Sequence, residues 1–195
     1  GTDFKVQLNE DGIFAGGEEK TLKGRVFNPN IPSEEVFTSP KAGAAEGIVY
    51  ATKPLSYQGQ LIENFSVRFE NGKAVEVRAE KGEELLKQMI SMDEGACMLG
   101  ECALIPYDSP ISNSGVLFYN TLFDENASCH LALGHGFNEC LKGYENYTNE
   151  QCKEHGINDS MIHVDFMIGS ADLSIVGVTA EGKRVQIFRD GNWAF

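Results

Sequence analysis

The chain has 195 residues, enough for one domain of ordinary size, and its 42% hydrophobic and 23% charged residues are typical of a soluble globular protein. Its formal net charge of −13 disfavours binding to nucleic acid or to an anionic membrane, because contacts to phosphate require clusters of Lys and Arg. No stretch approaches the roughly 18 apolar residues of a membrane-spanning helix, and we expect no signal peptide at the start.

In the first half of the chain, one hairpin and one helix have clear signals. Residues 66–70 and 73–78 alternate between apolar and polar side chains, and the Asn71-Gly72 dipeptide between them is a strong hairpin signal. Residues 83–92 have helical spacing, with acidic residues in the first turn. The first half therefore predicts a β-hairpin followed by a helix.

Short apolar runs dominate the second half. The expected elements are, in chain order, buried strands at 101–106 and 129–134, a helix at 148–155, a buried strand at 162–169, and a hairpin of strands at 173–178 and 185–188. Thr148 is the expected N-cap of the helix, whereas residues 115–123 are ambiguous. Together these elements predict an α+β fold, mainly an antiparallel, barrel-like β-sheet domain with a few short helices.

Two metal-capable side chains interrupt the last buried strand. His163 and Asp165 are two residues apart, so in a strand they point to the same face, roughly 7 Å apart along it. Burying an ionised Asp without a partner is very costly. The pair therefore needs a cation, or a hydrogen-bonded network around one.

The other three histidines differ in their settings. His130 is the one polar intruder in a second buried strand, and two such strands favour a shared site over two unrelated core histidines. His135 lies between two glycines in an expected turn, where it could line a pocket. His155 ends the predicted helix among charged neighbours, so we expect it to be solvated.

Acidic residues complete a set of metal-binding groups. Taken singly, Glu101 is interpreted as a solvated strand end, and Glu34 and Glu35 as loop acids. Taken with two imidazoles, these carboxylates are typical ligands of zinc, cobalt or manganese. Two such ions can share a nucleophilic water, which favours a hydrolase. The residues alone do not choose between Glu34 and Glu35.

The cysteines predict free thiols in a reducing cytoplasm. The chain has five cysteines, Cys97, Cys102, Cys129, Cys140 and Cys152. Their odd number and the lack of any C-x-x-C pair argue against a disulfide framework and against a structural zinc site.

Four stretches of the chain resemble the thermophilic metallo-aminopeptidases, the family that includes aminopeptidases T and S. They are residues 30–38, 100–110, 117–134 and 163–169, and their order and separation fit the family. The resemblance implies a di-metal exopeptidase that removes N-terminal residues from peptides. It also implies that family members form homodimers.

The resemblance assigns roles to residues of this chain. It places metal ligands for two divalent ions at Glu35, Glu101, His130, His163 and Asp165, with Glu101 as the bridging carboxylate. Glu34 is interpreted as a general base, or as an anchor for the α-ammonium group of the substrate.

Two departures from the family pattern matter. Phe137 stands where the family generally has an active-centre tyrosine, so a hydrogen-bond donor is missing unless Tyr144 or Tyr147 replaces it. Residues 1–195 correspond to the catalytic, metal-binding domain, and the N-terminal domain of the family is absent from this chain.

Three other functions would account for part of the sequence pattern. One is a domain that binds metal but is catalytically silent, because of Phe137 or the missing half. Another is a cysteine hydrolase using Cys129 with His163 and Asp165, although adjacent side chains of a strand point opposite ways. A β-rich binding module would leave the histidines and Asp165 unexplained.

Overall fold

The structure is a computed structural model that describes residues 1–195. Its strands are β1 (Asp3–Leu8), β2 (Glu19–Lys20), β3 (Val26–Phe27), β4 (Val36–Thr38), β5 (Pro40–Tyr50), β6 (Leu55–Tyr57), β7 (Gln60–Glu70), β8 (Lys73–Lys81), β9 (Leu99–Leu104), β10 (His130–Gly134), β11 (His163–Met167), β12 (Ile175–Val178), β13 (Arg184–Arg189) and β14 (Asn192–Trp193). Its helices are α1 (Glu83–Ile90), α2 (Pro110–Ser114), α3 (Thr121–Asp124) and α4 (Asn149–Glu154), with 3₁₀ turns η1 (Glu125–Ala127), η2 (Asn138–Cys140) and η3 (Tyr144–Asn146).

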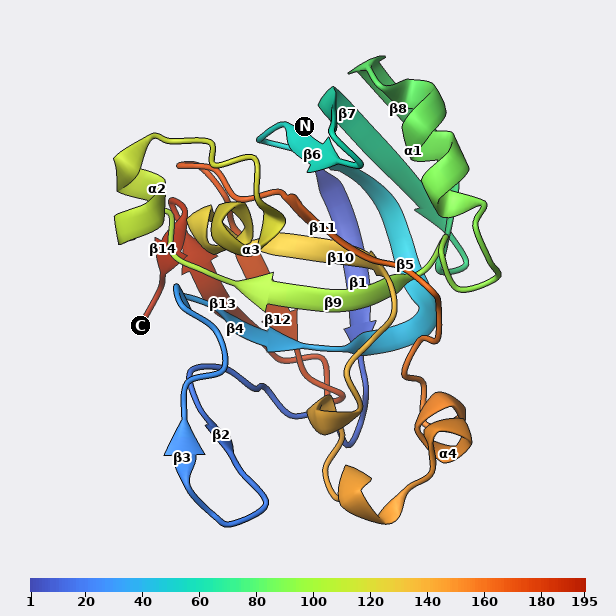
Figure 1. The fold of residues 1–195 in the computed structure, drawn as a ribbon, viewed down its shortest axis with the longest axis vertical. Helices are drawn as coiled ribbons and strands as arrows, with labels where there is room; N and C mark the ends of the chain where they lie inside the picture. Colours follow the sequence, from blue (N-terminus) through green and yellow to red (C-terminus); the bar gives the residue numbers. More distant parts are fainter.

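The strands form antiparallel sheets of five, four, three and two strands. The five-stranded sheet has the order β1-β5-β7-β6, with β8 also paired to β7, and the four-stranded sheet has the order β11-β10-β9-β4. Strands β9, β10 and β11 run side by side across the centre of the molecule (Figure 1). The sheets do not close into a barrel, so the predicted α+β class is confirmed as a set of open antiparallel sheets.

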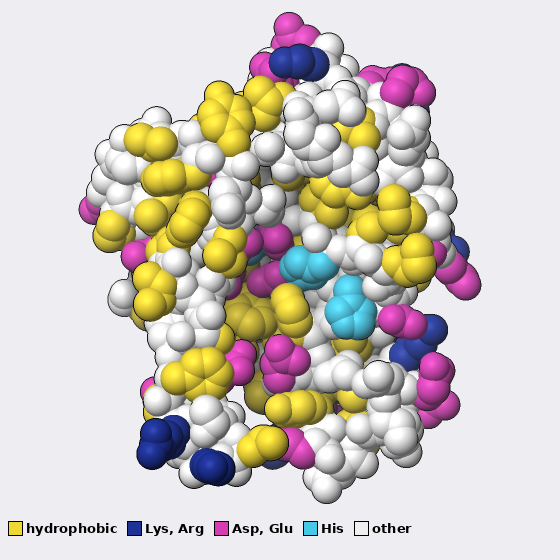
Figure 2. All heavy atoms as spheres, viewed as in Figure 1, with side chains coloured by type: hydrophobic (Ala, Val, Ile, Leu, Met, Phe, Trp, Pro, Cys, Tyr) yellow, Lys and Arg dark blue, Asp and Glu magenta, His cyan; other side chains and the backbone are white.

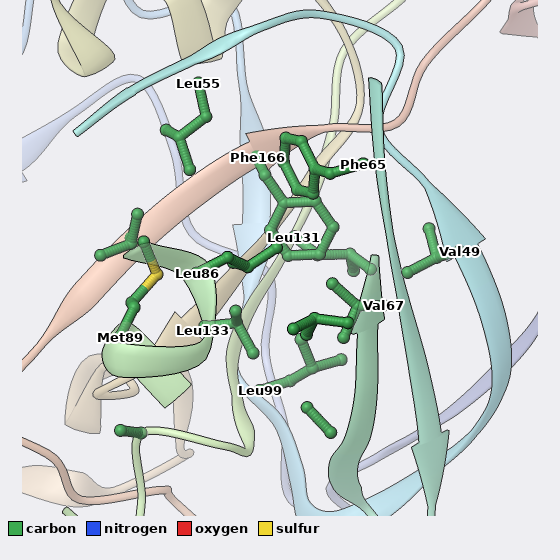
Figure 3. Close-up of a cluster of buried hydrophobic side chains, with 14 of the residues drawn as sticks. Val49, Leu55, Phe65, Val67, Leu86, Met89, Leu99, Leu131, Leu133 and Phe166 are labelled. Atoms are coloured by element: carbon green, nitrogen blue, oxygen red, sulfur yellow. The ribbon is translucent and has the colours of Figure 1, made fainter. Parts of the chain in front are cut away.

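One large hydrophobic core lies between the five-stranded and four-stranded sheets. Side chains from α1, β7, β10 and β11 meet in it, as Figure 3 shows: Phe65, Val67, Leu86, Met89, Leu131, Leu133 and Phe166. The Phe65 and Phe166 rings lie 5.8 Å apart between centroids and join the two sheets. The core therefore covers one face of the four-stranded sheet and leaves its other face for the site.

The predicted hairpins and helices are confirmed, with small shifts of their ends. Strands β7 and β8 are joined through Asn71-Gly72, and β12 and β13 form the later hairpin. The helix after β8 ends at Ile90 rather than at Met92, and Thr148 caps α4 through a capping box with Gln151. Of the ambiguous residues 115–123, residues 115–120 are irregular and residues 121–123 belong to α3.

No helix of the structure has both the length and the apolar character needed to cross a membrane.

Candidate metal centre

A row of three side chains crosses the four-stranded sheet on the face opposite the core. Antiparallel pairing sets Ala132 of β10 opposite Glu101 of β9 on one side and opposite Asp165 of β11 on the other. Because directly paired residues point to the same face, two carboxylates flank the small side chain of Ala132. The interpretation of Glu101 as a solvated strand end is wrong, since only 4% of the residue is exposed.

The histidines lie on the same face, one on each side of this row. His130 precedes Ala132 by two residues, and His163 pairs with Gly134, two residues after Ala132. The two-residue period of a strand therefore brings both imidazoles to the carboxylates. Glu35 is the residue immediately before β4, the edge strand that pairs with β9.

Close backbone packing at two glycines sets the register. At Gly100 the pairing of β9 with β10 shifts by one residue, and a Cβ there would lie 2.1 Å from the His135 carbonyl oxygen. At Gly134, where φ is +102°, a Cβ would lie 2.1 Å from the Ile162 carbonyl oxygen. Larger residues at these two positions would push β9 and β11 away from β10.

The side chains meet in two overlapping groups of ligand atoms. The Glu35 group consists of Glu35, Glu101 and His130, and the His163 group consists of Glu101, His163 and Asp165. In each group the candidate ligand atoms lie within 4.8 Å of one another. Glu101 belongs to both groups, so its carboxylate connects them.

The distances show how tightly each imidazole is held. His163 Nε2 lies 3.1 Å from Glu101 Oε2 and 3.2 Å from Asp165 Oδ1. His130 Nε2 lies 3.2 Å from Glu35 Oε2, 3.9 Å from Glu101 Oε1 and 3.9 Å from Asp165 Oδ1. Both Nε2 atoms thus face carboxylate oxygens at the centre of the cluster.

Three buried polar atoms of the cluster have no hydrogen-bond partner: Glu35 Oε2, His130 Nε2 and Asp165 Oδ1. Such atoms are costly to bury, because they lose their hydrogen bonds to water and gain none. All three belong to the groups that could bind a metal ion. Imidazole nitrogens together with carboxylate oxygens form a ligand set that fits zinc, cobalt or manganese.

The electrostatics of the cluster reflect this crowding of charges. Burial alone would lower the pKa of both histidines, but the carboxylates close to each ring raise the pKa of His130 to about 10 and that of His163 to about 11. Burial raises the pKa of Glu101. Burial would also raise the pKa of Asp165, but His163 and His130 together outweigh it and lower that pKa. Without a cation, positively charged imidazoles therefore balance the carboxylates.

The outer nitrogens of the two rings are held by backbone carbonyls. His163 Nδ1 lies 2.7 Å from the His135 carbonyl oxygen, and His130 Nδ1 lies 3.2 Å from that of Ser128. Because a carbonyl only accepts, each Nδ1 donates and each Nε2 is left to bind a metal. Histidine and acidic side chains gather in a hollow over β9 to β11 (Figure 2), and the His163 side chain is 26% exposed there.

A family model described as thermophilic metalloprotease matches residues 1–193 of the chain. The chain belongs to this thermophilic metalloprotease family. It is 52% identical over 195 residues to "Aminopeptidase AmpS" of Bacillus subtilis and 49% identical over 193 residues to "Aminopeptidase T" of Thermus aquaticus. These matches cover 100% and 99% of the chain, but 48% and 47% of the two relatives.

The fold also matches that of a solved structure. Wild-type AmpT from Thermus thermophilus matches with a TM-score of 0.93 and 47% identity, over 100% of this chain and 48% of that one. The chain therefore spans about half the length of the curated relatives it matches. The metalloprotease family implies a divalent metal cofactor, and the relatives are named aminopeptidases.

One acidic residue beside this candidate centre was not identified from the sequence. Glu125 of η1 is 8% exposed, and the Asp165 carboxylate is the charged group that acts most strongly on it. Burial, followed by the charge of Asp165, raises the pKa of Glu125 to about 9. The available signal was an acid five residues before His130, just after the ambiguous residues 115–123.

The structure brings Glu35, and not Glu34, to the imidazole of His130. Glu34 lies beside it, partly exposed, and its backbone N–H donates to Asn126 Oδ1 at 2.6 Å. Phe137 lies at the edge of the centre, with its ring centroid 4.9 Å from that of His163. The position that the family resemblance assigns to a tyrosine thus contacts a candidate ligand.

The two tyrosines weighed as replacements for the missing phenol lie elsewhere. Tyr144 and Tyr147 pack against a small separate cluster of Leu141, Cys152 and Ile157. Tyr147 also stacks on His155, which is exposed at the end of α4 as predicted. Neither phenol is therefore held against the metal centre.

The remaining candidate residues have other roles. Burial raises the pKa of the Cys129 thiol to about 11, so this buried cysteine has little thiolate at neutral pH, which argues against a cysteine hydrolase. His135 lines a small polar pocket beside α4, together with Asn138, Lys153 and Asp159. His135 contributes its backbone carbonyl to the metal centre, and its ring lies 3.6 Å from the Asp159 carboxylate.

Proposed function

We propose that this chain carries the metal centre of a dinuclear exopeptidase that releases N-terminal amino acids from peptides. The observation that carries the proposal is the pair of ligand groups that share Glu101, with three buried polar atoms left without partners. Relatives named aminopeptidases, about 50% identical over the whole chain, support the same reaction. Zinc, cobalt and manganese fit the ligand set.

Each group would hold one ion. Glu35 and His130 would bind the first, His163 and Asp165 the second, and Glu101 both, because its two oxygens lie 3.9 Å from His130 Nε2 and 3.1 Å from His163 Nε2. Divalent ions in this arrangement supply Lewis-acid catalysis and make water a nucleophile at neutral pH. The protein's part is to keep each Nε2 and carboxylate oxygen in place before the ions and the substrate arrive.

Two residues beside the ligands take part in the proposal. Glu34 is the proposed general base, or the anchor for the substrate's α-ammonium group, since it lies partly exposed next to Glu35. The buried Glu125 carboxyl lies where the charge of Asp165 acts on it, and it would fix the orientation of that ligand or join it in binding the ion.

Metal analysis of single variants tests the proposal. Glu101→Gln removes the shared carboxylate, so we expect it to lose both ions, and His163→Ala should lose the ion of its own group. The measurement is metal content per chain after dialysis against zinc or cobalt at defined free concentration. Unchanged two-ion occupancy in either variant would contradict the proposed centre.

A second candidate function is a domain that binds metal but is catalytically silent. The observation that favours it is Phe137, whose ring contacts His163 but has no hydroxyl to donate to the substrate carbonyl. Losing one oxyanion donor costs on the order of 10²–10³ in rate. If the chain is silent for this reason, Phe137→Tyr should raise turnover of an aminoacyl-chromophore substrate by about that factor at unchanged metal content.

The outcome of that assay separates the two functions. Turnover by the unmodified chain would support the exopeptidase and show that no phenol is required. Activity that appears only in Phe137→Tyr would support the silent domain. Because the relatives are about twice as long as this chain, the assay should include the chain with the other half of the family protein added in trans.

The proposal also covers the cellular compartment, the partners and the domain organisation of the protein. All five cysteines are free, which supports a reducing cytoplasm. The charge of −13 disfavours nucleic acid as a partner. Residues 1–195 would be the catalytic domain of a longer enzyme, and homodimer formation stays a prediction.

A further inference from the structure

Two buried asparagines lie outside both ligand groups but contact the backbone beside each of them. Asn126 and Asn158 are 0% and 3% exposed. We propose that they are positioning residues with separate tasks: Asn126 holds the Glu35 group in place, and Asn158 holds the His163 group. The proposal rests on the dinuclear centre described above and adds the device that keeps its two halves in place.

Asn158 fixes the backbone on both sides of one residue. Its side-chain Nδ2 donates to the Gly134 carbonyl oxygen at 2.6 Å. Its backbone carbonyl oxygen accepts the Gly136 N–H at 2.9 Å. His135 lies between these two glycines, and its carbonyl oxygen accepts the Nδ1–H of His163 at 2.7 Å. Asn158 therefore holds, from both sides, the carbonyl that orients the His163 ring.

The same side chain connects this segment to a second loop. Asn158 Nδ2 also donates to the Gly95 carbonyl oxygen at 2.8 Å. A Cβ at Gly95 would lie 1.9 Å from the Asp159 carbonyl oxygen, so the two segments pack without room for a side chain. The loop before β9 thus supports the segment that leads into β11.

Asn126 has the corresponding place at the other end of the centre. Its Oδ1 accepts the Glu34 N–H at 2.6 Å, and its Nδ2 donates to the Leu122 carbonyl oxygen at 3.0 Å. Glu35 precedes the first residue of β4, so it lies outside the paired part of that strand. The amide of Asn126 therefore holds the backbone that carries Glu35 where strand pairing does not.

An amide side chain suits both positions. It both donates and accepts, so it can satisfy neighbouring backbone groups inside the protein. It adds no charge to a centre already crowded with carboxylates, and it does not titrate. Its hold on the backbone is therefore independent of pH and of metal.

The test uses Asn126→Ala and Asn158→Ala, with Asn9→Ala as the matched control. Asn9 is also buried and donates to a backbone carbonyl, that of Ser39 at 3.1 Å, but it holds no ligand. Cobalt binding is measured by calorimetry and by the visible spectrum of the bound ion. Glu35→Ala and His163→Ala supply the reference signature for loss of each ion.

The two asparagine variants should fail in different ways. Asn158→Ala should reproduce the His163→Ala signature and Asn126→Ala that of Glu35→Ala, each with about 10–100-fold weaker binding of one ion. Asn9→Ala should bind both ions as the unmodified chain does, even where it is less stable. Loss of packing alone predicts no such correspondence.

A second pair of variants covers the case in which an alanine variant does not fold. Asn126→Asp keeps the acceptor for the Glu34 N–H but loses the bond to Leu122 and adds a charge, so the Glu35 group should lose less affinity than in Asn126→Ala. Asn158→Asp loses both donated bonds and should weaken the His163 group. Unchanged affinities in Asn126→Ala and Asn158→Ala, or equal loss of both ions in each, would overturn the positioning roles. An unmodified chain that binds fewer than two ions would instead contradict the proposed function.

Discussion

At the scale of single residues, the site was predictable because its charged and imidazole side chains occur within apolar strand sequences. His130, His163 and Asp165 each interrupt a predicted buried strand and Glu101 opens another, and the structure brings all four together on one sheet face. The choice of Glu35 over Glu34 depended on which side chain faces the sheet. Glu125 was not predicted because it lies in the three-residue 3₁₀ turn η1, which is too short to show a sequence period from which a buried face could be inferred.

Asp93 provides a residue-scale prediction outside the centre. Its carboxylate accepts the Met161 N–H at 2.7 Å, the Ala96 N–H at 2.8 Å and the Gly95 N–H at 2.9 Å, and it also accepts the hydroxyl of Ser160. The Met161 bond, then those from Ser160 and the other amides, hold the pKa of Asp93 below its usual value against the effect of burial. Asp93→Asn should lower the free energy of unfolding by about 1–3 kcal/mol at pH 7.

The sign of the pH dependence follows from the lowered pKa. A carboxyl whose pKa is lower when folded stabilises the protein above its unfolded pKa, and that stability is lost as pH falls through the folded value. The difference between the unmodified chain and Asp93→Asn should therefore shrink below about pH 4. Urea unfolding at pH 7 and at pH 3 measures it, and a difference that stays constant would contradict the role.

At the scale of elements, β10 separates the core from the site. Leu131 and Leu133 face the core, whereas His130, Ala132 and Gly134 face the metal centre. The apolar run 129–134 predicted a buried strand, and the structure confirms it. The run could not show that both faces are used, because alternation is hidden when a strand is buried on both sides.

Substitutions on the two faces of β10 should have opposite effects. Ala132→Val places extra methyl groups between Glu101 and Asp165, so it should weaken binding of both ions and change stability little. Leu131→Ala leaves a cavity in the core, so it should cost about 2–5 kcal/mol of stability and keep both ions. Metal content and thermal unfolding of both variants measure this, and normal metal affinity in Ala132→Val would count against the arrangement.

The register of β9 against β10 also could not be predicted from the sequence. The one-residue shift at Gly100 brings Glu101 opposite Ala132, and nothing local to residues 99–104 specifies it. The shift depends on the close approach of the 134–135 backbone, which is a contact between distant segments. The hairpins, by contrast, were predictable, because their turns and alternation are local.

At the scale of the whole molecule, one open sheet lies between a hydrophobic core and a hollow lined with charged groups. The α+β class followed from many short strands and few helices, but the arrangement of the sheets did not, since barrel and open sheets share the same strand patterns. The fold largely buries three carboxylates and the imidazole of His130, and it leaves the His163 side chain 26% exposed. Such a cluster requires protons or cations to balance it.

The central claim is that two divalent ions occupy this cluster, and anomalous scattering from a crystal soaked with zinc or cobalt tests it most directly. The account predicts two peaks about 3.5–4 Å apart, a spacing typical of dinuclear sites. One peak should lie among Glu35, Glu101 and His130, and the other among Glu101, His163 and Asp165. A single peak in the cluster, or peaks only at other places on the protein, would contradict the account.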